Sequence, residues 1–117
     1  MCIRDSTTND IVSIAIDLDN GKIYAAKNGT WETSGDPTSG ATGTGSFANI
    51  SDTTKTFVPI IGNLNYVNAS LHYLNFGNPS YANSSDAADA NGFGAFEFSP
   101  PAGYLALCTK NLGSDGG

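Results

Sequence analysis

The sequence predicts an all-β fold, built of antiparallel strands that pack as a sandwich. Three observations lead to this expectation. Apolar and polar residues alternate in short runs, Asn-Gly and Pro-Pro turn signals separate these runs, and no segment repeats apolar residues at helical spacing. The length of 117 residues fits one domain with a single core.

The clearest element is a hairpin between residues 11 and 27. The even-numbered positions from Val12 to Leu18 carry branched apolar side chains and alternate with smaller or polar residues, which predicts a strand that buries this apolar face. Asn20-Gly21 follows, and both residues tolerate the positive φ angles of a two-residue hairpin turn. Folding about that turn predicts three cross-strand pairs: Leu18 with Ile23, Ile16 with Ala25, and Asp19 with Lys22.

Four more short strands are expected further along the chain, at Phe57–Ile61, Val67–Phe76, Phe93–Phe98 and Tyr104–Cys108. Pro59 lacks an amide donor, so the first of these is expected at a sheet edge or at a bulge. Two polar segments, 32–46 and 77–92, separate the strands. The first carries too few apolar residues to order itself and is expected to be a functional or mobile surface loop.

Composition excludes several classes of function. The chain has 5 basic against 11 acidic residues and a net charge of −6, which disfavours binding to nucleic acid or an anionic membrane. No apolar run approaches the roughly 20 residues of a membrane span, so no membrane insertion is expected. Cys108 is expected as a small core residue, and neither a disulfide nor a cofactor is predicted.

The two ends of the sequence give the expected domain limits. Residues 1–6, which include Cys2, resemble a translated sequencing adapter and are excluded from the fold. We expect a partial domain over residues 7–112, followed by a linker or truncated tail over residues 113–117.

Three stretches of this sequence resemble SPRY domains. The run Asp10–Tyr24, followed by Lys27-Asn28-Gly29, is similar to the central hairpin of that family, and Leu74–Gly77 is similar to a late strand. The most specific stretch is Phe93–Leu112, which contains Ser-Pro-Pro-Ala-Gly-Tyr and Leu-Cys-Thr-Lys-Asn-Leu. It resembles the end of SPRY-like domains in virion structural proteins of tailed marine phages, as does the run from Lys27 to Trp31 with the Ser34–Pro37 loop.

The resemblance implies a concanavalin-A-like sandwich of two bent sheets that recognises partners through loops at one rim and catalyses no reaction. The implied partner is a protein or glycan on a host surface, or another virion protein, and the implied location is the phage particle. The resemblance covers only the second half of a SPRY domain, so we expect the chain to be truncated at its N-terminus. Open sheet edges would then leave it marginally stable or self-associating. A clean monomer that melts above about 65 °C would contradict this expectation.

Several residues could carry chemistry, but each is expected to be structural. His72 has no second histidine with which to bind zinc, and Glu97 stands alone between two phenylalanines. Asp17 and Asp19 share a strand face, as carboxylates do in glycan-active sandwiches, but Asp19 falls in the turn. The run Asp86–Gly92 lacks the oxygen ligands of a calcium loop. The alternative function is therefore a concanavalin-A-like glycan-binding or glycan-active domain, and a purely architectural sandwich is a third.

Trp31 is the residue with the sharpest functional interpretation. It follows the Asn28-Gly29 turn and opens the long polar loop, where an indole could stack on a sugar or anchor a protein partner. It could equally fold back over the sandwich as a lid. We predict a recognition surface made by Asn28, Trp31 and Asp36, with no metal.

Overall fold

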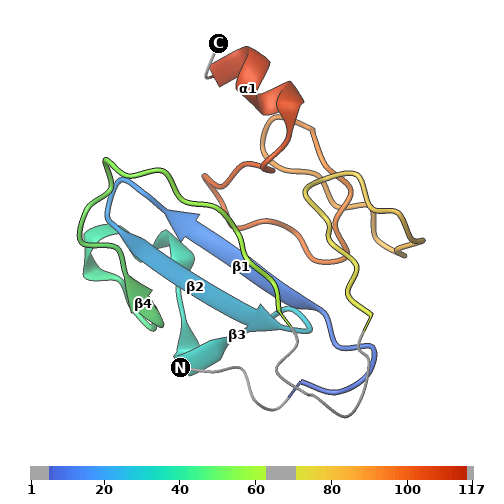
Figure 1. Cartoon of the computed structure of the whole chain (residues 1–117), viewed down its shortest axis with the longest axis horizontal. Helices are drawn as coiled ribbons and strands as arrows, with labels where there is room; N and C mark the ends of the chain where they lie inside the picture. Colours follow the sequence, from blue (N-terminus) through green and yellow to red (C-terminus); the bar gives the residue numbers. More distant parts are fainter. Residues whose placement is uncertain (1–5, 63–70, 116–117) are drawn as a thin grey trace.

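The computed structural model describes residues 6–62 and 71–115 (Figure 1). Its regular elements are a small antiparallel sheet and a few short helices, so the expectation of a β-rich fold is confirmed. In chain order the elements are β1 (Val12–Asp17), β2 (Lys22–Lys27), β3 (Thr30–Trp31), the 3₁₀ turns η1 (Glu32–Ser34) and η2 (Pro37–Thr42), β4 (Ala48–Asn49) and the helix α1 (Thr109–Asp115).

Strand β2 is the centre of the sheet. Strand β1 pairs with it along its whole length on one side, while the short strands β3 and β4 pair with opposite ends of β2 on the other side. The described residues form this one sheet, so the second sheet of a sandwich stays a prediction.

The predicted hairpin is confirmed, but its predicted register is wrong by two residues. Asp17 lies opposite Lys22, and Ile16 lies opposite Ile23. The reason is the turn, which spans four residues because the carboxylate of Asp17 accepts bonds from the backbone N–H (3.0 Å) and side-chain amide (2.8 Å) of Asn20. Because the shift is two residues, the cross-strand partners change, but the same side chains still share each face of the hairpin.

The prediction that the branched face of β1 is the buried one is wrong. Val12, Ile14 and Ile16 remain 42–53% exposed, whereas Ala15 between them is 5% exposed. Tyr24, directly opposite Ala15, is the most deeply buried large side chain of the described residues, at 1%. The alternation therefore indicated a strand correctly, but the loop that follows β3 packs on the face that carries the smaller residues.

That loop, residues 32–46, is ordered, contrary to the expectation from its composition. Polar groups replace apolar burial: the Thr33 hydroxyl donates to the Gly45 carbonyl (2.7 Å), and the Asp36 N–H donates to the Thr44 carbonyl (2.9 Å). The Ser39 hydroxyl accepts from the Thr44 N–H (2.9 Å) and lies 3.3 Å from the Tyr24 hydroxyl. A loop of this composition can be ordered because side chains satisfy the backbone groups that a strand ladder would otherwise bond.

The C-terminal region, residues 71–115, is organised around one buried carboxylate. Asp89 is 8% exposed and accepts hydrogen bonds from the backbone N–H groups of Phe93 (2.9 Å) and Ala106 (2.8 Å). It also accepts from the side-chain amide of Asn111 (2.7 Å) and from the backbone N–H of Asn91 (3.0 Å). One side chain therefore joins its own loop at residues 89–93, the stretch at Ala106 and the first turn of α1.

The carboxylate of Asp89 is ionised under ordinary conditions. Burial alone would raise its pKa, but the hydrogen bonds from Ala106, Asn111, Phe93 and Asn91 outweigh burial and lower the pKa to about 2. The negative charge is therefore stabilised by donors of the chain itself.

Three of the other predicted strands are wrong within the described residues. Phe57–Ile61 pairs with no described strand, and Ile60 is 88% exposed. Phe93–Phe98 makes only a single bridge, between Ala87 and Phe96, because Gly94 adopts a φ of +95° that a strand does not accommodate. Tyr104–Cys108 is irregular because the Ala106 N–H is bonded to Asp89.

The predicted strand Val67–Phe76 falls partly outside the described residues, which resume at Leu71. Residues 71–76 are not a strand, since the amide of Asn75 donates to the Ala95 carbonyl (2.7 Å) and its oxygen accepts from the Gly77 N–H (2.8 Å). These local bonds compete with a ladder. The expectation that no segment is helical is also wrong, because Thr109–Asp115 forms α1 across the predicted start of the linker.

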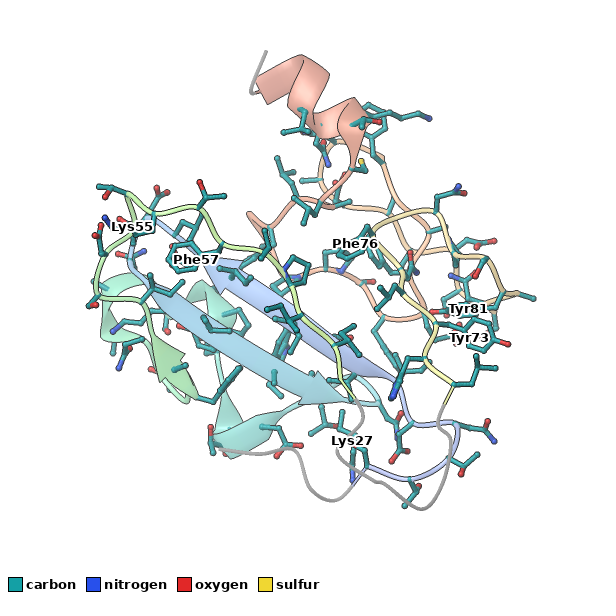
Figure 2. All side chains as sticks on the ribbon, in the orientation of Figure 1. Lys27, Lys55, Phe57, Tyr73, Phe76 and Tyr81 are labelled. Atoms are coloured by element: carbon teal, nitrogen blue, oxygen red, sulfur yellow. The ribbon has the colours of Figure 1, made fainter. Side chains whose placement is uncertain are left out.

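The two regions meet at the Asn28-Gly29 turn and the end of the hairpin. Gly29 has a φ of +81°, and a Cβ built on it would lie 2.6 Å from Cδ1 of Phe98, so the phenyl ring rests directly on this glycine. At the other end of β1, the Tyr104 hydroxyl donates to the Pro37 carbonyl (2.9 Å). Figure 2 shows Phe57 over the sheet, while Tyr73, Phe76 and Tyr81 gather in the C-terminal region.

The chain is somewhat more extended than a compact domain of this length: its radius of gyration is 14.7 Å, compared with about 13.4 Å. Among the described residues the buried apolar side chains are few and mostly alanine: Ala15, Tyr24, Ala25, Ala26 and Ala106. Such a small core is the physical reason to expect low stability.

Candidate functional site

Asn28, the first predicted site residue, is exposed, and its side chain forms hydrogen bonds with the residues just before β1. Its side-chain oxygen accepts from the Ile11 N–H (2.9 Å), and its amide donates to Asp10 (2.7 Å). The backbone has a φ of +49°, which asparagine tolerates better than most residues. Hydrogen bonds from the Thr7 N–H and then from Asn28 lower the pKa of Asp10. The polar groups of Asn28 are thus used within the fold.

Trp31 is neither a fully exposed binding side chain nor a lid that is folded completely over the sheet. Its ring meets Tyr24 edge to face, with 6.5 Å between ring centroids and an interplanar angle of 83°. The side chain is half-buried, so part of the indole folds back on the sheet and part reaches solvent. A ligand could contact only the exposed part.

Asp36 is exposed and caps the turn η2. Its carboxylate accepts from the hydroxyl (2.6 Å) and the backbone N–H (2.9 Å) of Thr38. These two bonds lower the pKa of Asp36, with the hydroxyl contributing most. The cap leaves part of the carboxylate facing solvent.

The structure brings the start of the Asp36 turn close to Trp31, because the Cβ position of Gly35, which precedes Asp36, is 3.5 Å from Cβ of Trp31. Asn28 belongs instead to the turn at the end of β2, where Phe98 packs. The three predicted residues are therefore neighbours along the chain, with Asn28 committed to a structural role.

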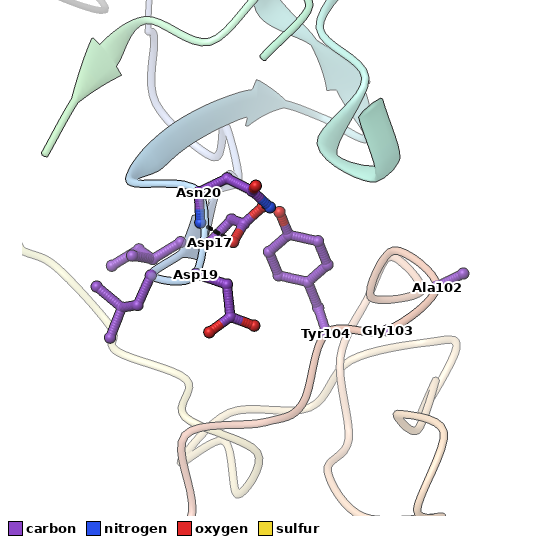
Figure 3. A pocket seen from close by; sticks show the side chains of 8 residues that line it. Asp17, Asp19, Asn20, Ala102, Gly103 and Tyr104 are labelled. Carbon is purple, nitrogen blue, oxygen red and sulfur yellow. Dashed lines mark hydrogen bonds between the residues drawn. The ribbon is translucent and has the colours of Figure 1, made fainter. Parts of the chain in front are cut away.

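A pocket of about 320 Å³ opens where the β1–β2 turn faces the turn at residues 102–104 (Figure 3). Its lining consists of Ile16, Asp17, Leu18, Asp19, Asn20, Ala102, Gly103 and Tyr104. The Asp19 carboxylate projects between the hairpin end and the Tyr104 turn, while Asp17 is held by Asn20 (Figure 3). The volume lies at the lower end of the range for small-molecule sites.

The electrostatics of this pocket are negative. Burial raises the pKa of Tyr104 to about 12, and Asp17, Tyr24 and Asp36 shift it in the same direction. The side-chain bond from Asn20, followed by its backbone bond and the charge of Lys22, lowers the pKa of Asp17 despite partial burial. Tyr104 therefore stays protonated and Asp17 ionised at neutral pH.

The other residues considered for chemistry are structural or exposed. Glu97 accepts from the hydroxyl (2.5 Å) and N–H (2.7 Å) of Ser84, which lower its pKa. Within the run Asp86–Gly92, Asp89 is surrounded by N–H donors, an environment that repels a cation. His72 is exposed. Within residues 6–62 and 71–115, no three or more histidine, cysteine or acidic side chains are grouped to hold a metal ion.

Sequence reasoning missed Tyr104 and the open pocket that it lines. Tyr104 was expected at the start of a strand, and the Pro-Pro-Ala-Gly sequence before it indicated a turn without showing what the turn would face. The contact to Pro37 spans 67 positions, and no local signal encodes a separation of that size.

Comparison with known proteins adds no assignment: no protein family, curated protein or solved structure matches this chain. The SPRY resemblance therefore stays a prediction. Among the described residues, no helix is both long and apolar enough to cross a membrane.

Proposed function

We propose that the chain is a non-catalytic recognition or display module of a phage virion structural protein, with the fold of a SPRY-like, concanavalin-A-like sandwich. It would bind a protein or a glycan of the host surface through the loop at residues 32–46 and the neighbouring hairpin end. The observation that carries this proposal is an exposed polar loop whose own hydrogen bonds hold its conformation on one side of a sheet. Binding residues are commonly placed on loops positioned by such a scaffold.

Backbone strain in the same loop supports a functional role. Thr33 and Ser34 both adopt a φ of +53°, in the left-handed region that residues other than glycine rarely enter. Each such residue costs on the order of 1 kcal/mol, and such strain concentrates at binding sites and switches. The hairpin followed by an Asn-Gly turn also agrees with the arrangement implied by the SPRY resemblance.

The proposal is tested by placing a large charged side chain on the loop without disturbing its internal bonds. Thr42 is exposed, and its hydroxyl forms no hydrogen bond with any described residue, so Thr42→Arg should leave the fold intact. Binding of the fluorescently labelled chain to a panel of intact marine bacteria is measured by flow cytometry. We expect one or more strains to bind the wild type, with at least about tenfold weaker binding by Thr42→Arg.

Thr109→Arg, an exposed position in α1, is the matched control and should bind as the wild type does. Equal binding by the two variants would contradict a role for the loop. A chain that labels no strain in a broad panel would contradict host recognition itself.

A glycan-active domain is the second candidate, because Asp17 and Asp19 both line the pocket. Retaining and inverting glycosidases need one carboxyl group to carry a proton while its partner is ionised. Hydrogen bonds from Asn20 lower the pKa of Asp17, so Asp17 suits the ionised member of such a pair. Release of reducing sugars from bacterial envelope polysaccharides would favour this candidate over a binding module.

A further inference from the structure

We infer that the pocket between the β1–β2 turn and Tyr104 is a binding site for a lysine side chain presented by a protein partner. This inference rests on the proposed recognition function for the existence of a protein partner. The binding chemistry itself follows from the pocket.

The apolar part of the pocket suits an aliphatic stem. Ile16 and Leu18 line it and are 46% and 45% exposed, so both keep surface that a ligand could cover. The turn opposite adds little bulk: Gly103 has no atom within 4 Å of its Cβ position. Methylene groups that pack on this surface would be removed from water, which favours binding.

The polar part of the pocket suits a cation. The Asp19 side chain projects into the opening, and its carboxylate makes no hydrogen bond or ion pair with the described residues, so it is available (Figure 3). Asp17 adds a second negative charge nearby; after burial, the charge of Asp17 is the largest cause of the raised pKa of Tyr104.

No basic residue of the described chain lines the pocket. The charge of Lys22 acts on Asp17 and lowers its pKa, but the Lys22 ammonium donates to the side chain of Asn49 (2.9 Å) on the other edge of β2. The negative charge in the pocket is thus only partly balanced from within the chain.

An apolar surface beside a negative charge favours one kind of cation over others. An ammonium at the end of a flexible four-carbon stem can place its charge at Asp19 while the stem covers Ile16 and Leu18. An amino sugar has the charge without the stem, and norleucine has the stem without the charge. These two compounds therefore separate the two parts of the recognition.

The experiment is an NMR titration of the full 117-residue chain at 150 mM salt with Nα-acetyl-lysine-N-methylamide. We expect the largest shifts at the amides of Asp19, Asn20, Gly103 and Tyr104. The norleucine analogue and glucosamine should each bind at least about fivefold more weakly. Equal shifts with the norleucine analogue, or with glucosamine, would overturn the assignment of a lysine side chain.

Two variants that each remove one negative charge test the position of the site. Asp19→Asn should weaken binding of the lysine analogue about fivefold, the size expected for a partly exposed ion pair. Asp86→Asn should leave binding unchanged, because Asp86 is exposed and does not line the pocket. An equal loss in the two variants would show that the lysine analogue responds only to net charge, and would overturn the site.

The same variants distinguish failure of this inference from failure of the proposed function. If Asp19→Asn binds bacteria as the wild type does while Thr42→Arg does not, the pocket is not the recognition site and the proposed function stands. If the lysine analogue binds at Asp19 but the chain labels no bacteria, the pocket chemistry stands and host recognition is lost.

Discussion

Residues 6–50 and residues 71–115 are held together by different kinds of interaction. The first region has a strand ladder and packs Tyr24 against Trp31 and the η2 turn. The second has a single bridge between Ala87 and Phe96, and side-chain bonds to Asp89 and from Asn75 replace the ladder. A ladder repeats one kind of bond over many residues, whereas a hub concentrates the bonds of several segments on one group.

This difference indicates how each region should fail. Loss of one residue pair in a ladder leaves its neighbours bonded, so the hairpin should depend chiefly on the apolar contact beneath it. Loss of the hub releases several segments at once. Stability of the two regions should therefore respond to different substitutions, and amide hydrogen exchange can follow each region separately.

The largest effect is expected at Tyr24, the centre of the packing in the first region. Tyr24→Ala removes a side chain that is 1% exposed and should lower the free energy of unfolding by about 3–5 kcal/mol. Denaturant unfolding followed by circular dichroism measures the change. Tyr73→Ala in the second region, where the ring is 59% exposed, is the control and should cost less than about 1 kcal/mol. Similar losses in the two variants would show that Tyr24 is not the packing centre.

The second-largest effect is a selective loss, in acid, of the hydrogen bonds to the Asp89 carboxylate. The folded pKa of Asp89 is about 2, below the ordinary value of 3.8, so its stabilisation is present above pH 4 and lost as the pH falls through 2. Hydrogen exchange between pH 5 and pH 2 should show the amides of Phe93 and Ala106 losing protection in this window.

Asp89→Asn is the matched variant, because it keeps the shape of the side chain and removes the charge. It should expose the same amides to exchange already at pH 5 while those of β2 stay protected. Uniform loss of protection across both regions would mean that they unfold as one unit.

The smallest effect measures the contact between the regions. Gly29→Ala and Gly103→Ala place alanine at φ angles of +81° and +84°, so the backbone cost, about 1 kcal/mol, should be shared. Only the first variant also meets a neighbour, at 2.6 Å from the Phe98 ring. We expect Gly29→Ala to cost about twice as much by thermal unfolding. Equal costs would show that the Phe98 ring yields freely and does not dock the two regions.

The sequence by itself determined the hairpin. The period of two over Val12–Asp17 and the turn-forming Asn20-Gly21 are local signals, and a strand with its turn is a local structure. The acidic character of the chain, and the turn at Asn28-Gly29, could also be predicted because they depend on composition or on two adjacent residues. Of the predicted site, the half-exposed position of Trp31 at the start of the loop follows from the same local reasoning.

Only the tertiary structure decided which face of β1 is buried, how the loop at residues 32–46 is ordered, and where the pocket lies. The face depends on which segment packs against it, and the small side chain of Ala15 is covered while Ile14 is not. The hub and the pocket depend on pairs such as Asp89 with Asn111 and Pro37 with Tyr104, which are 22 and 67 positions apart. Hydrogen bonds over such separations have no periodic signature, because a single polar residue looks the same in the sequence whether it faces water or another segment.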